Sequence, residues 1–398
     1  MSGRDPIYLD HHATTPVDPR VLEAMLPYFR EDFGNAASRS HVFGWRAEAA
    51  VELARETIAG ALGARDPTEI VFTSGATESI NLALKGSAQV LASTRDHLVV
   101  ARTEHRAVLD TARALESAGC SLTWLPVDGE GLVDPDAVRR AIGPRTLWVS
   151  VMAANNEIGV LQPLAEIGSL CRERGVLFHC DAAQAAGKIP LDVDSFGIDL
   201  LSVSGHKLYG PKGIGALYVR SRPRVRLLPQ MHGGGHERGL RSGTLPVPLI
   251  VGLGRALALS LEGMAVESKR LRELRDRLLS QLHAGFDGVD LNGHPERRLP
   301  GNLNLSFAGV DAAALLLALP DVALSTGSAC SSAEPHPSHV LAALGLDEAR
   351  VRSALRIGIG RFNTEAEIDR VAEQLVREAR RLRALSTPGT RPGYPRGQ

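Results

Sequence analysis

The chain has 398 residues, enough for two or three domains or for one large α/β domain with a smaller partner. Hydrophobic residues make up 44% of it, and 45 basic side chains are balanced by 45 acidic ones. A formal net charge of zero argues against a dedicated nucleic-acid-binding protein, because such proteins carry a basic excess.

The first ten residues contain no apolar signal core, and no run of 18 apolar residues follows, so we expect neither a secretion signal nor a membrane span. The four cysteines, Cys120, Cys171, Cys180 and Cys330, lie far apart and form no CxxC pair. This spacing argues against a disulfide framework and against a structural zinc site. The sequence therefore predicts a cytoplasmic protein in a reducing compartment.

Short apolar runs alternate with helical stretches in the middle of the chain. Strands are expected at 71–72, 97–101, 147–152, 176–180 and 200–204, and helices at 107–118, 135–142 and 163–174. This alternation predicts a mostly parallel sheet that is covered on both faces. Open sheets of this kind bind ligands at the carboxyl ends of their strands, and all five expected strands are followed by polar residues.

The sequence pattern changes near residue 255. A long helix rich in Arg, Glu and Leu is expected over about 256–284, and a last amphipathic helix near 364–385. We therefore expect a large domain over 15–255 and a small domain that combines 1–14 with 256–385. The remaining residues, 386–398, are rich in Pro and Gly and predict a disordered tail.

Lysine is scarce in this chain, with five lysines against 40 arginines. One of them, Lys207, follows an expected strand within Ser204-Gly-His-Lys-Leu-Tyr-Gly-Pro-Lys-Gly-Ile-Gly215. A surface lysine in a turn is the ordinary interpretation. Lysine also forms imines with carbonyl cofactors, and a Gly-rich turn at a strand end can present it to one. Lys207 is therefore a candidate Schiff-base lysine.

Two polar side chains follow the strand expected at 176–180. Asp181 would be partly desolvated there and would need a cationic partner to stay charged. The protonated pyridine nitrogen of pyridoxal phosphate (PLP) is such a partner, whereas the alternative is an Asp that caps the next helix. Gln184 lies about one turn further on, within reach of the ring oxygen of the same cofactor.

A phosphate site is expected at Gly75, Ala76 and Thr77, in the segment Thr73-Ser-Gly-Ala-Thr-Glu78. This segment joins a strand to a helix, and a helix N-terminus offers free backbone N–H groups and a favourable dipole to a phosphate. By itself the signal is weak, because the segment has neither the Walker lysine spacing nor GxGxxG.

His105 and Cys330 are candidate catalytic side chains. His105 closes a strand in Thr103-Glu-His105 and could stack on a planar cofactor and move protons, although a lone His is more often structural. Cys330 has small polar neighbours that suit an exposed thiol on a mobile loop, as a nucleophilic cysteine requires. The other three cysteines lie in apolar or helical surroundings and are expected to be buried.

Two histidine pairs suggest other chemistry. His232-Gly-Gly-Gly-His236 resembles a metal cluster and also the oxyanion loop of esterases, but no GxSxG elbow accompanies it and no third ligand follows at an ordered spacing. His11-His12 is interpreted as a loop pair rather than as a pair of ligands. We expect no resident metal, although Cys330 could ligate a transient iron–sulfur cluster.

Taken in order, these motifs resemble the cysteine desulfurases of the NifS/IscS group, which belong to the class V aminotransferases among the fold-type I PLP enzymes. The likeness runs from Tyr8-Leu-Asp-His-His-Ala-Thr-Thr-Pro16 to Arg356-Ile-Gly-Ile-Gly-Arg-Phe-Asn-Thr364. Further shared motifs are Asn155-Asn-Glu-Ile-Gly159, Asp181-Ala-Ala-Gln184, Ser204-Gly-His-Lys207, Arg241-Ser-Gly-Thr244 and Ser328-Ala-Cys330. The resemblance implies an α/β fold: a mostly parallel, seven-stranded sheet in the large domain, and a smaller α+β domain that carries the Cys330 loop.

The resemblance also implies roles for single residues. Lys207 would hold PLP, Asp181 would pair with its pyridine nitrogen, Gln184 would reach its ring hydroxyl and His105 would stack on its ring. The rest of the cofactor site would consist of Gly75, Ala76, Thr77, Asn156, Ser204 and His206, with Thr244 supplied by the other subunit of a homodimer. Asn35, Asn156 and Arg356 would orient the substrate, with Arg356 binding its carboxylate through two hydrogen bonds.

The reaction implied by the resemblance converts L-cysteine to L-alanine. Cys330 would take the sulfur as a persulfide and pass it to an iron–sulfur scaffold or another acceptor protein; no nucleic acid or membrane partner is expected. A selenocysteine lyase and another fold-type I enzyme remain alternatives, although an aminotransferase needs no nucleophilic thiol. A PLP-free scaffold protein is a further alternative, against which the intact Lys207, Asp181 and Cys330 argue.

Overall fold

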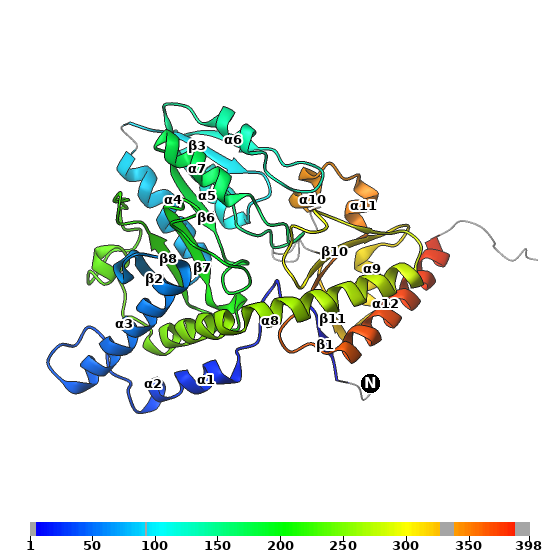
Figure 1. Ribbon diagram of the computed structural model, residues 1–398, viewed down its shortest axis with the longest axis horizontal. Helices are drawn as coiled ribbons and strands as arrows, with labels where there is room; N and C mark the ends of the chain where they lie inside the picture. Colours follow the sequence, from blue (N-terminus) through cyan, green and yellow to red (C-terminus); the bar gives the residue numbers. More distant parts are fainter. Residues whose placement is uncertain (1–4, 92–93, 327–337, 387–398) are drawn as a thin grey trace, which may run out of the picture.

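The computed structural model describes residues 5–91, 94–326 and 338–386. A seven-stranded sheet, in the order β2-β8-β7-β6-β5-β3-β4, forms its centre (Figure 1). Its strands are β2 (Ile70–Thr73), β3 (His97–Ala101), β4 (Ser121–Leu125), β5 (Thr146–Ser150), β6 (Leu177–Asp181), β7 (Leu200–Ser204) and β8 (Gly215–Val219). Only β8 runs against its neighbours within this sheet, β2 and β7. The expected fold class is confirmed. Cys330 and residues 387–398 of the expected tail lie outside the described residues.

Helices cover both faces of this sheet, as the alternating pattern predicts. The helices of this half are α1 (Pro19–Met25), α2 (Pro27–Arg30), α3 (Val42–Leu62), α4 (Ala76–Leu91), α5 (Arg106–Ser117), α6 (Pro135–Ala141) and α7 (Leu164–Arg174). α4 and α5 pack with Leu98 and Trp148 in an apolar cluster on one face, whereas α3, α6 and α7 pack with Val99 and Phe178 on the other. Every residue of the inner strands β5, β7 and β8 is buried, and most of these residues are apolar, because helices cover both faces of the sheet.

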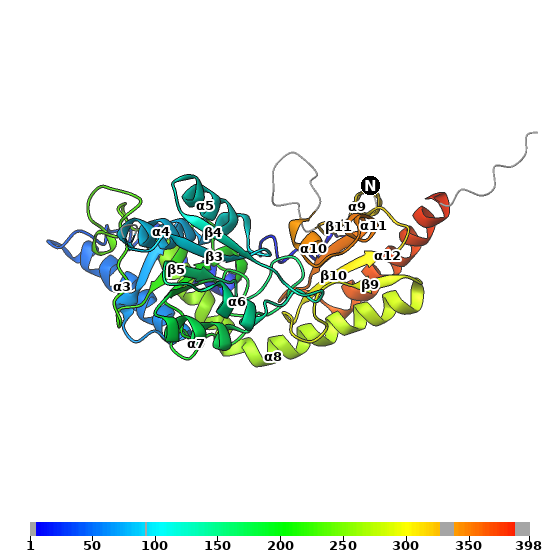
Figure 2. The same ribbon diagram turned by 90° about the horizontal axis from the view of Figure 1, so that it is seen from above.

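One long helix, α8 (Val247–Gly285), runs along both halves of the molecule (Figures 1 and 2). Its first part packs in the core beside the sheet through residues such as Leu253, and its second part packs in another core through residues such as Leu278. By length and composition α8 could cross a membrane, but its apolar residues fill these two cores. It begins before the expected residue 256, because Pro248 is tolerated in a first helical turn. The predicted domain boundary near residue 255 remains a prediction.

The second half of the molecule is built on a small antiparallel sheet. β10 (Asn302–Phe307) lies between β9 (Val289–Leu291) and β12 (Ala354–Gly358). The helices of this half are α9 (Ala312–Leu317), α10 (His339–Ala343), α11 (Glu348–Arg352) and α12 (Glu365–Ser386). β1 (Ile7–Tyr8) pairs in parallel with β11 (Val322–Ala323), so the N-terminal chain joins the second half before it returns to the first.

A buried ion pair connects α3 to the loop that precedes α8. Both guanidinium ends of Arg55 lie 2.8 Å from the carboxylate oxygens of Glu237, and the two side chains are 3% and 1% exposed. Glu237 also accepts a hydrogen bond of 2.7 Å from the backbone N–H of Phe72, and Arg55 lies over the Phe72 ring. The pair therefore holds β2, the strand that leads into the expected phosphate site, against α3.

Replacing Arg55 with Met is predicted to lower the free energy of unfolding by about 3–5 kcal/mol, because it leaves the Glu237 carboxylate buried without its cationic partner. Urea unfolding of the full chain, followed by tryptophan fluorescence, measures this change. The control is Arg139→Met, which removes an exposed ion pair with Asp136 on α6 and is expected to have no measurable effect. Equal changes in the free energy of unfolding of the two variants would show that the buried ion pair contributes no more to stability than the exposed one.

Candidate active site

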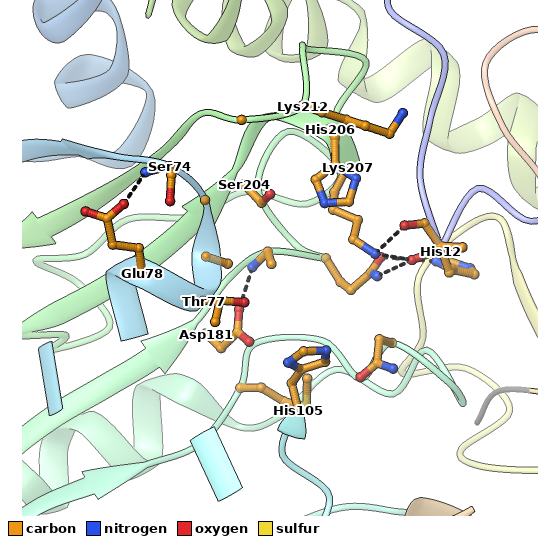
Figure 3. A pocket seen from close by; sticks show the side chains of 18 residues that line it. His12, Ser74, Thr77, Glu78, His105, Asp181, Ser204, His206, Lys207 and Lys212 are labelled. Carbon is orange, nitrogen blue, oxygen red and sulfur yellow. Dashed lines mark hydrogen bonds between the residues drawn. The ribbon is translucent and has the colours of Figure 1, made fainter. Parts of the chain in front are cut away.

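Five strands that run in the same direction end around one cavity of about 430 Å³ (Figure 3). The loops after β2, β3, β5, β6 and β7 each contribute residues to it. Among its lining residues are ten that the sequence predicts: Gly75, Ala76, Thr77, His105, Asn156, Asp181, Gln184, Ser204, His206 and Lys207. The structure therefore brings together most of the expected cofactor site at the carboxyl edge of the sheet, where open α/β sheets bind ligands.

Three expected residues do not line this cavity. Asn35 is exposed in the loop before α3, where its side chain accepts a hydrogen bond from the N–H of Ala37, and Thr244 is exposed in the loop before α8. Arg356 is fully buried in β12. It donates to the carbonyl of Asn156 at 3.1 Å and to Asp10 Oδ1 at 2.8 Å, so it lies behind a residue that does line the cavity.

Lys207 is held by a turn of the N-terminal chain. It ends the short 3-10 turn Gly205–Lys207 after β7, and its Nζ donates to the carbonyl oxygens of His12 at 2.5 Å and Ala13 at 2.8 Å. Figure 3 shows the lysine reaching across the cavity to this turn. Two carbonyl acceptors stabilise an ammonium group, because it offers three donors and no acceptor.

Asp181 is the last residue of β6 rather than the first residue after it, and it is 4% exposed. Its Oδ1 accepts a hydrogen bond of 2.9 Å from the N–H of Ala183. Burial raises the pKa of this carboxyl, while the nearby His105 and Lys207 work in the opposite direction. A ligand with a positive charge in the cavity would therefore favour the carboxylate form.

His105 is oriented by the helix that follows it. Its Nδ1 accepts a hydrogen bond of 3.1 Å from the N–H of Ala107, so the side chain caps α5. In the neutral ring the proton must then lie on Nε2. Burial lowers the pKa of His105, which the charge of Asp181 opposes, so the neutral ring is favoured. A neutral, planar imidazole at the cavity wall suits stacking on an aromatic cofactor.

Glu104 is a buried acid that the sequence analysis missed. Its Oε1 accepts a hydrogen bond from the N–H of Met152, and its Oε2 has no hydrogen-bond partner within the described residues. Burial and the charge of Asp181 raise its pKa well above the ordinary value. These two effects favour the neutral form of Glu104, while Asp181 is the member of this pair that lines the cavity. In the sequence, the position of Glu104 next to His105 at the end of an expected strand was the feature that could have identified it.

The opposite end of the cavity suits a phosphate group. α4 begins at Ala76, directly after Gly75, whose φ of +154° favours glycine. Ser204, His206 and Lys212 line the same cavity. Burial, together with Lys207 and Lys212, lowers the pKa of His206 to about 4, so His206 is neutral and can donate or accept a hydrogen bond.

Glu78 is the acidic residue of this helix end, and Arg241 pairs with it. Arg241 donates to both carboxylate oxygens of Glu78, at 2.8 and 3.2 Å, and the N–H of Ser74 donates to one of them at 2.7 Å. Burial opposes the ionisation of Glu78, but these hydrogen bonds bring its pKa below the ordinary value. Glu78 is thus a neutralised carboxylate and does not repel an anion at the start of α4.

The other eight lining residues were not expected: His12, Ala13, Ser74, Glu78, Met152, Ala183, Lys212 and Gly213. Lys212 belongs to the same Gly-rich segment as Lys207, and its occurrence in a lysine-poor chain was an available signal. The backbone carbonyls of His12 and Ala13 could not be expected, because nothing in the sequence shows which segment folds across the lysine.

The other histidine and cysteine expectations have mixed outcomes. His236 is structural, since its Nδ1 accepts a hydrogen bond of 3.2 Å from the N–H of Gly243. In the part of the chain that the structure describes, no three His, Cys, Asp or Glu side chains are grouped to hold a metal ion.

Cys171 and Cys180 are buried as expected, but Cys120 is only half-buried, because it lies in the turn between α5 and β4. Burial raises the pKa of all three thiols, which makes them weak nucleophiles.

Comparisons with known proteins show which family the chain resembles. A family model described as aminotransferase class-V matches residues 7–371. A cysteine desulfurase IscS of Anaeromyxobacter sp. (strain Fw109-5) is 58% identical over 382 residues, covering 96% of this chain and 94% of that protein. A solved NifS-like protein has a TM-score of 0.88 at 37% identity and covers 95% of this chain and 100% of its own. A structure described as SspA in complex with cysteine has a TM-score of 0.80 at 40% identity, covering 90% and 100%.

The Gly75→Ala variant is predicted to bind PLP at least about tenfold more weakly, because a φ of +154° is strained for alanine and the start of α4 must move to relieve it. Fluorescence titration of the cofactor-free protein with PLP measures the affinity. Gly119→Ala is the matched control: its φ is +108°, and an added Cβ meets nothing within 4 Å. It should lower stability but not affinity. Unchanged PLP binding by Gly75→Ala would contradict the proposed phosphate position.

Proposed function

The chain belongs to the class-V aminotransferase family, as a relative of the cysteine desulfurases, and on this premise we propose that it is a PLP-dependent cysteine desulfurase. It takes the sulfur of L-cysteine and releases L-alanine. The observation that carries this proposal is the convergence of Lys207, Asp181 and His105 on one cavity whose far end suits a phosphate. The alternatives of a selenocysteine lyase and an aminotransferase are not favoured by the relatives.

The residues around the cavity fit PLP. Asp181 is a buried carboxyl whose charge needs a cationic partner, and a pyridinium nitrogen is one. The start of α4, together with Ser204, fits the phosphate, and Lys207 fits the aldehyde. When bound, PLP supplies an electron sink that stabilises negative charge on the carbon next to the amino group of the substrate. Its negative ring oxygen would meet the side-chain amide of Gln184.

Lys207 has two roles in this proposal. It holds the cofactor until the amine of L-cysteine displaces it, and it then moves protons. The carbonyl oxygens of His12 and Ala13 give the displaced amine a defined position, because they already receive it in this structure. They favour its ammonium form, so Lys207 carries a proton that it can deliver to the carbon that loses sulfur.

The side of the cavity near Asn156 is the proposed position of the substrate. Arg356 binds the carbonyl of Asn156, and this supports its assignment to the carboxylate of L-cysteine. In this structure Asp10 occupies one end of the Arg356 guanidinium. Binding of the substrate would therefore require the substrate carboxylate to replace Asp10 there. Asn35 lies away from the cavity, and its proposed role would require a movement of its loop.

Sulfur transfer is assigned to Cys330. Its thiolate attacks the sulfur of L-cysteine, a sulfur–sulfur bond forms, and the carbon–sulfur bond breaks with its electron pair remaining on carbon. A proton from Lys207 then completes the methyl group of L-alanine. The chain on either side of the Cys330 segment supports this assignment. Ser325 pairs with the backbone of Arg356, and Ser338 Oγ donates to Glu157 Oε2 at 2.5 Å, directly beside Asn156.

A homodimer and a protein acceptor of sulfur complete the proposal. Thr244, assigned to the cofactor site of the other subunit, is exposed and lies outside the cavity of its own chain. Large apolar side chains are exposed between α1 and the start of α3, in these helices and in the segments that join them, namely Leu22, Leu26, Phe29, Phe33, Phe43 and Trp45. Exposed apolar surface of this kind is typical of a protein interface. The acceptor would be an iron–sulfur scaffold or another sulfur-carrying protein.

Replacing Lys207 with Ala is expected to abolish alanine formation from L-cysteine and to remove the absorbance of covalently held PLP, because alanine has no amine that could form the covalent link to the cofactor. Alanine is measured by amino-acid analysis. Lys269→Ala, at an exposed position on α8, is the control and should behave like the unchanged protein. Turnover by Lys207→Ala near the normal rate would refute its assignment.

Cys330→Ala should still bind PLP and still change the cofactor spectrum when L-cysteine is added, yet release no detectable alanine. The reaction of L-cysteine with the cofactor needs no protein thiol, whereas removal of the sulfur does. Stopped-flow absorbance and alanine release separate the two steps. Cys120→Ala is the control, since Cys120 is the most accessible of the three described cysteines. If Cys120→Ala stops alanine release and Cys330→Ala does not, the nucleophile is misassigned.

A further inference from the structure

A second, smaller cavity of about 30 Å³ lies directly behind the proposed active site. His12 lines both cavities. Among the other lining residues of the small cavity are His11, Lys188 and Glu267, in mostly apolar surroundings. Lys188 reaches from this cavity toward Gln184, which lines the large one. A lysine with no proposed part in the reaction is thus in contact with a residue that faces the cofactor.

Lys188 is directed at Gln184 by the turn that follows β6. The two residues are four positions apart, and Lys188 Nζ donates to Gln184 Oε1 at 3.2 Å. Burial, with the charge of Lys207, lowers the pKa of Lys188 to about 7. The charged and titratable groups that face Lys188 are Lys207, Glu267, Arg356, His11, His12 and His206. The amine can donate an N–H to Gln184 with or without its charge.

The hydrogen bonds of Gln184 decide which way round its amide lies. Oε1 accepts from Lys188 and lies 3.2 Å from His12 Nδ1, while Nε2 donates to the carbonyl oxygen of His12 at 2.8 Å. Turning the amide by 180° would put Oε1 against the carbonyl oxygen of His12, acceptor against acceptor, and would put Nε2 against Lys188, donor against donor whenever Lys188 is charged. The second hydrogen of Nε2 then remains available to a ligand in the large cavity.

We propose that Lys188 is a positioning residue that fixes the amide of Gln184 with an N–H, and not its carbonyl oxygen, toward the ring oxygen of PLP. This inference rests on the proposed function, because it assumes PLP in the large cavity. An N–H at the ring oxygen stabilises negative charge there, whereas a carbonyl oxygen would oppose it. Lys188 therefore acts on the cofactor through Gln184, without touching it.

The test replaces Lys188 with Met in the cofactor-loaded full chain, which keeps the length of the side chain and removes its N–H groups. The pH midpoint of the absorbance change of bound PLP should rise by about one unit, because negative charge on the ring oxygen loses its support. Release of PLP, followed by absorbance after dilution, should become faster. Lys269→Met on the surface of α8 is the matched control and should leave both readouts unchanged.

Two more variants separate positioning from other effects. Gln184→Met should raise the midpoint at least as much, and the double variant should go no further than Gln184→Met alone, since both changes remove the same hydrogen bond. Additive shifts, or no shift in Lys188→Met, would overturn the inference. Lys188→Gln keeps an N–H donor, so bound PLP in this variant should have the same pH midpoint as in the unchanged protein. This variant preserves the test if Lys188→Met is unstable. A shift of the midpoint in Lys188→Gln as large as that in Lys188→Met would also overturn the inference.

The outcomes distinguish this inference from the proposed function. If the protein binds no PLP under any condition, or forms no alanine from L-cysteine, the proposed function itself is refuted. A protein that binds PLP and shifts its midpoint with Gln184→Met but not with Lys188→Met keeps the proposed function and loses only the role of Lys188.

Discussion

The cost of burying the Asp181 carboxylate is the constraint on which the site depends. This side chain ends a strand that is covered on both faces, so water cannot stabilise its charge. The surroundings are arranged accordingly: burial and the charge of Asp181 raise the pKa of Glu104, which favours its neutral form, while His105 and Lys207 favour the ionised form of Asp181. A cationic ring in the cavity would complete this balance. The contact between the cofactor ring and Asp181 would thus be one that this buried carboxylate requires for its own charge.

The N-terminal chain connects this balance to the rest of the molecule. After pairing with β11 in the second half, it places the carbonyl oxygen of His12 where both Lys207 and Gln184 donate to it. Two residues earlier, Asp10 binds Arg356 of β12. One short segment therefore touches Lys207, which is proposed to hold the cofactor, Gln184, which is proposed to face its ring oxygen, and Arg356, which is proposed to bind the substrate. A displacement of the second half relative to the sheet would act on all three.

Several elements were predictable because their local pattern and their tertiary surroundings agree. β3 and β7 have the expected bounds, since both are short apolar runs that end in turn residues. The strands β4 and β8 were not expected. β4 is a partly exposed edge strand with an uneven apolar pattern, and β8 begins with Gly215 inside a segment that reads as a loop. Gly215 is needed there, because an added Cβ would approach Gly75 Cα to 2.6 Å.

By itself the sequence indicated the fold class and the candidate lysine, because these follow from strand ends and from motifs that are local in the chain. The resemblance to the cysteine desulfurases supplied most of the other expected residues around the cavity. Only the tertiary structure decided which of them share one cavity and in what state of charge. Charge state depends on burial and on neighbours far away in the sequence, as for Glu104 beside Asp181. The role of the His12 carbonyl was likewise hidden, since every residue has a carbonyl and only the fold selects the one that lies across Lys207.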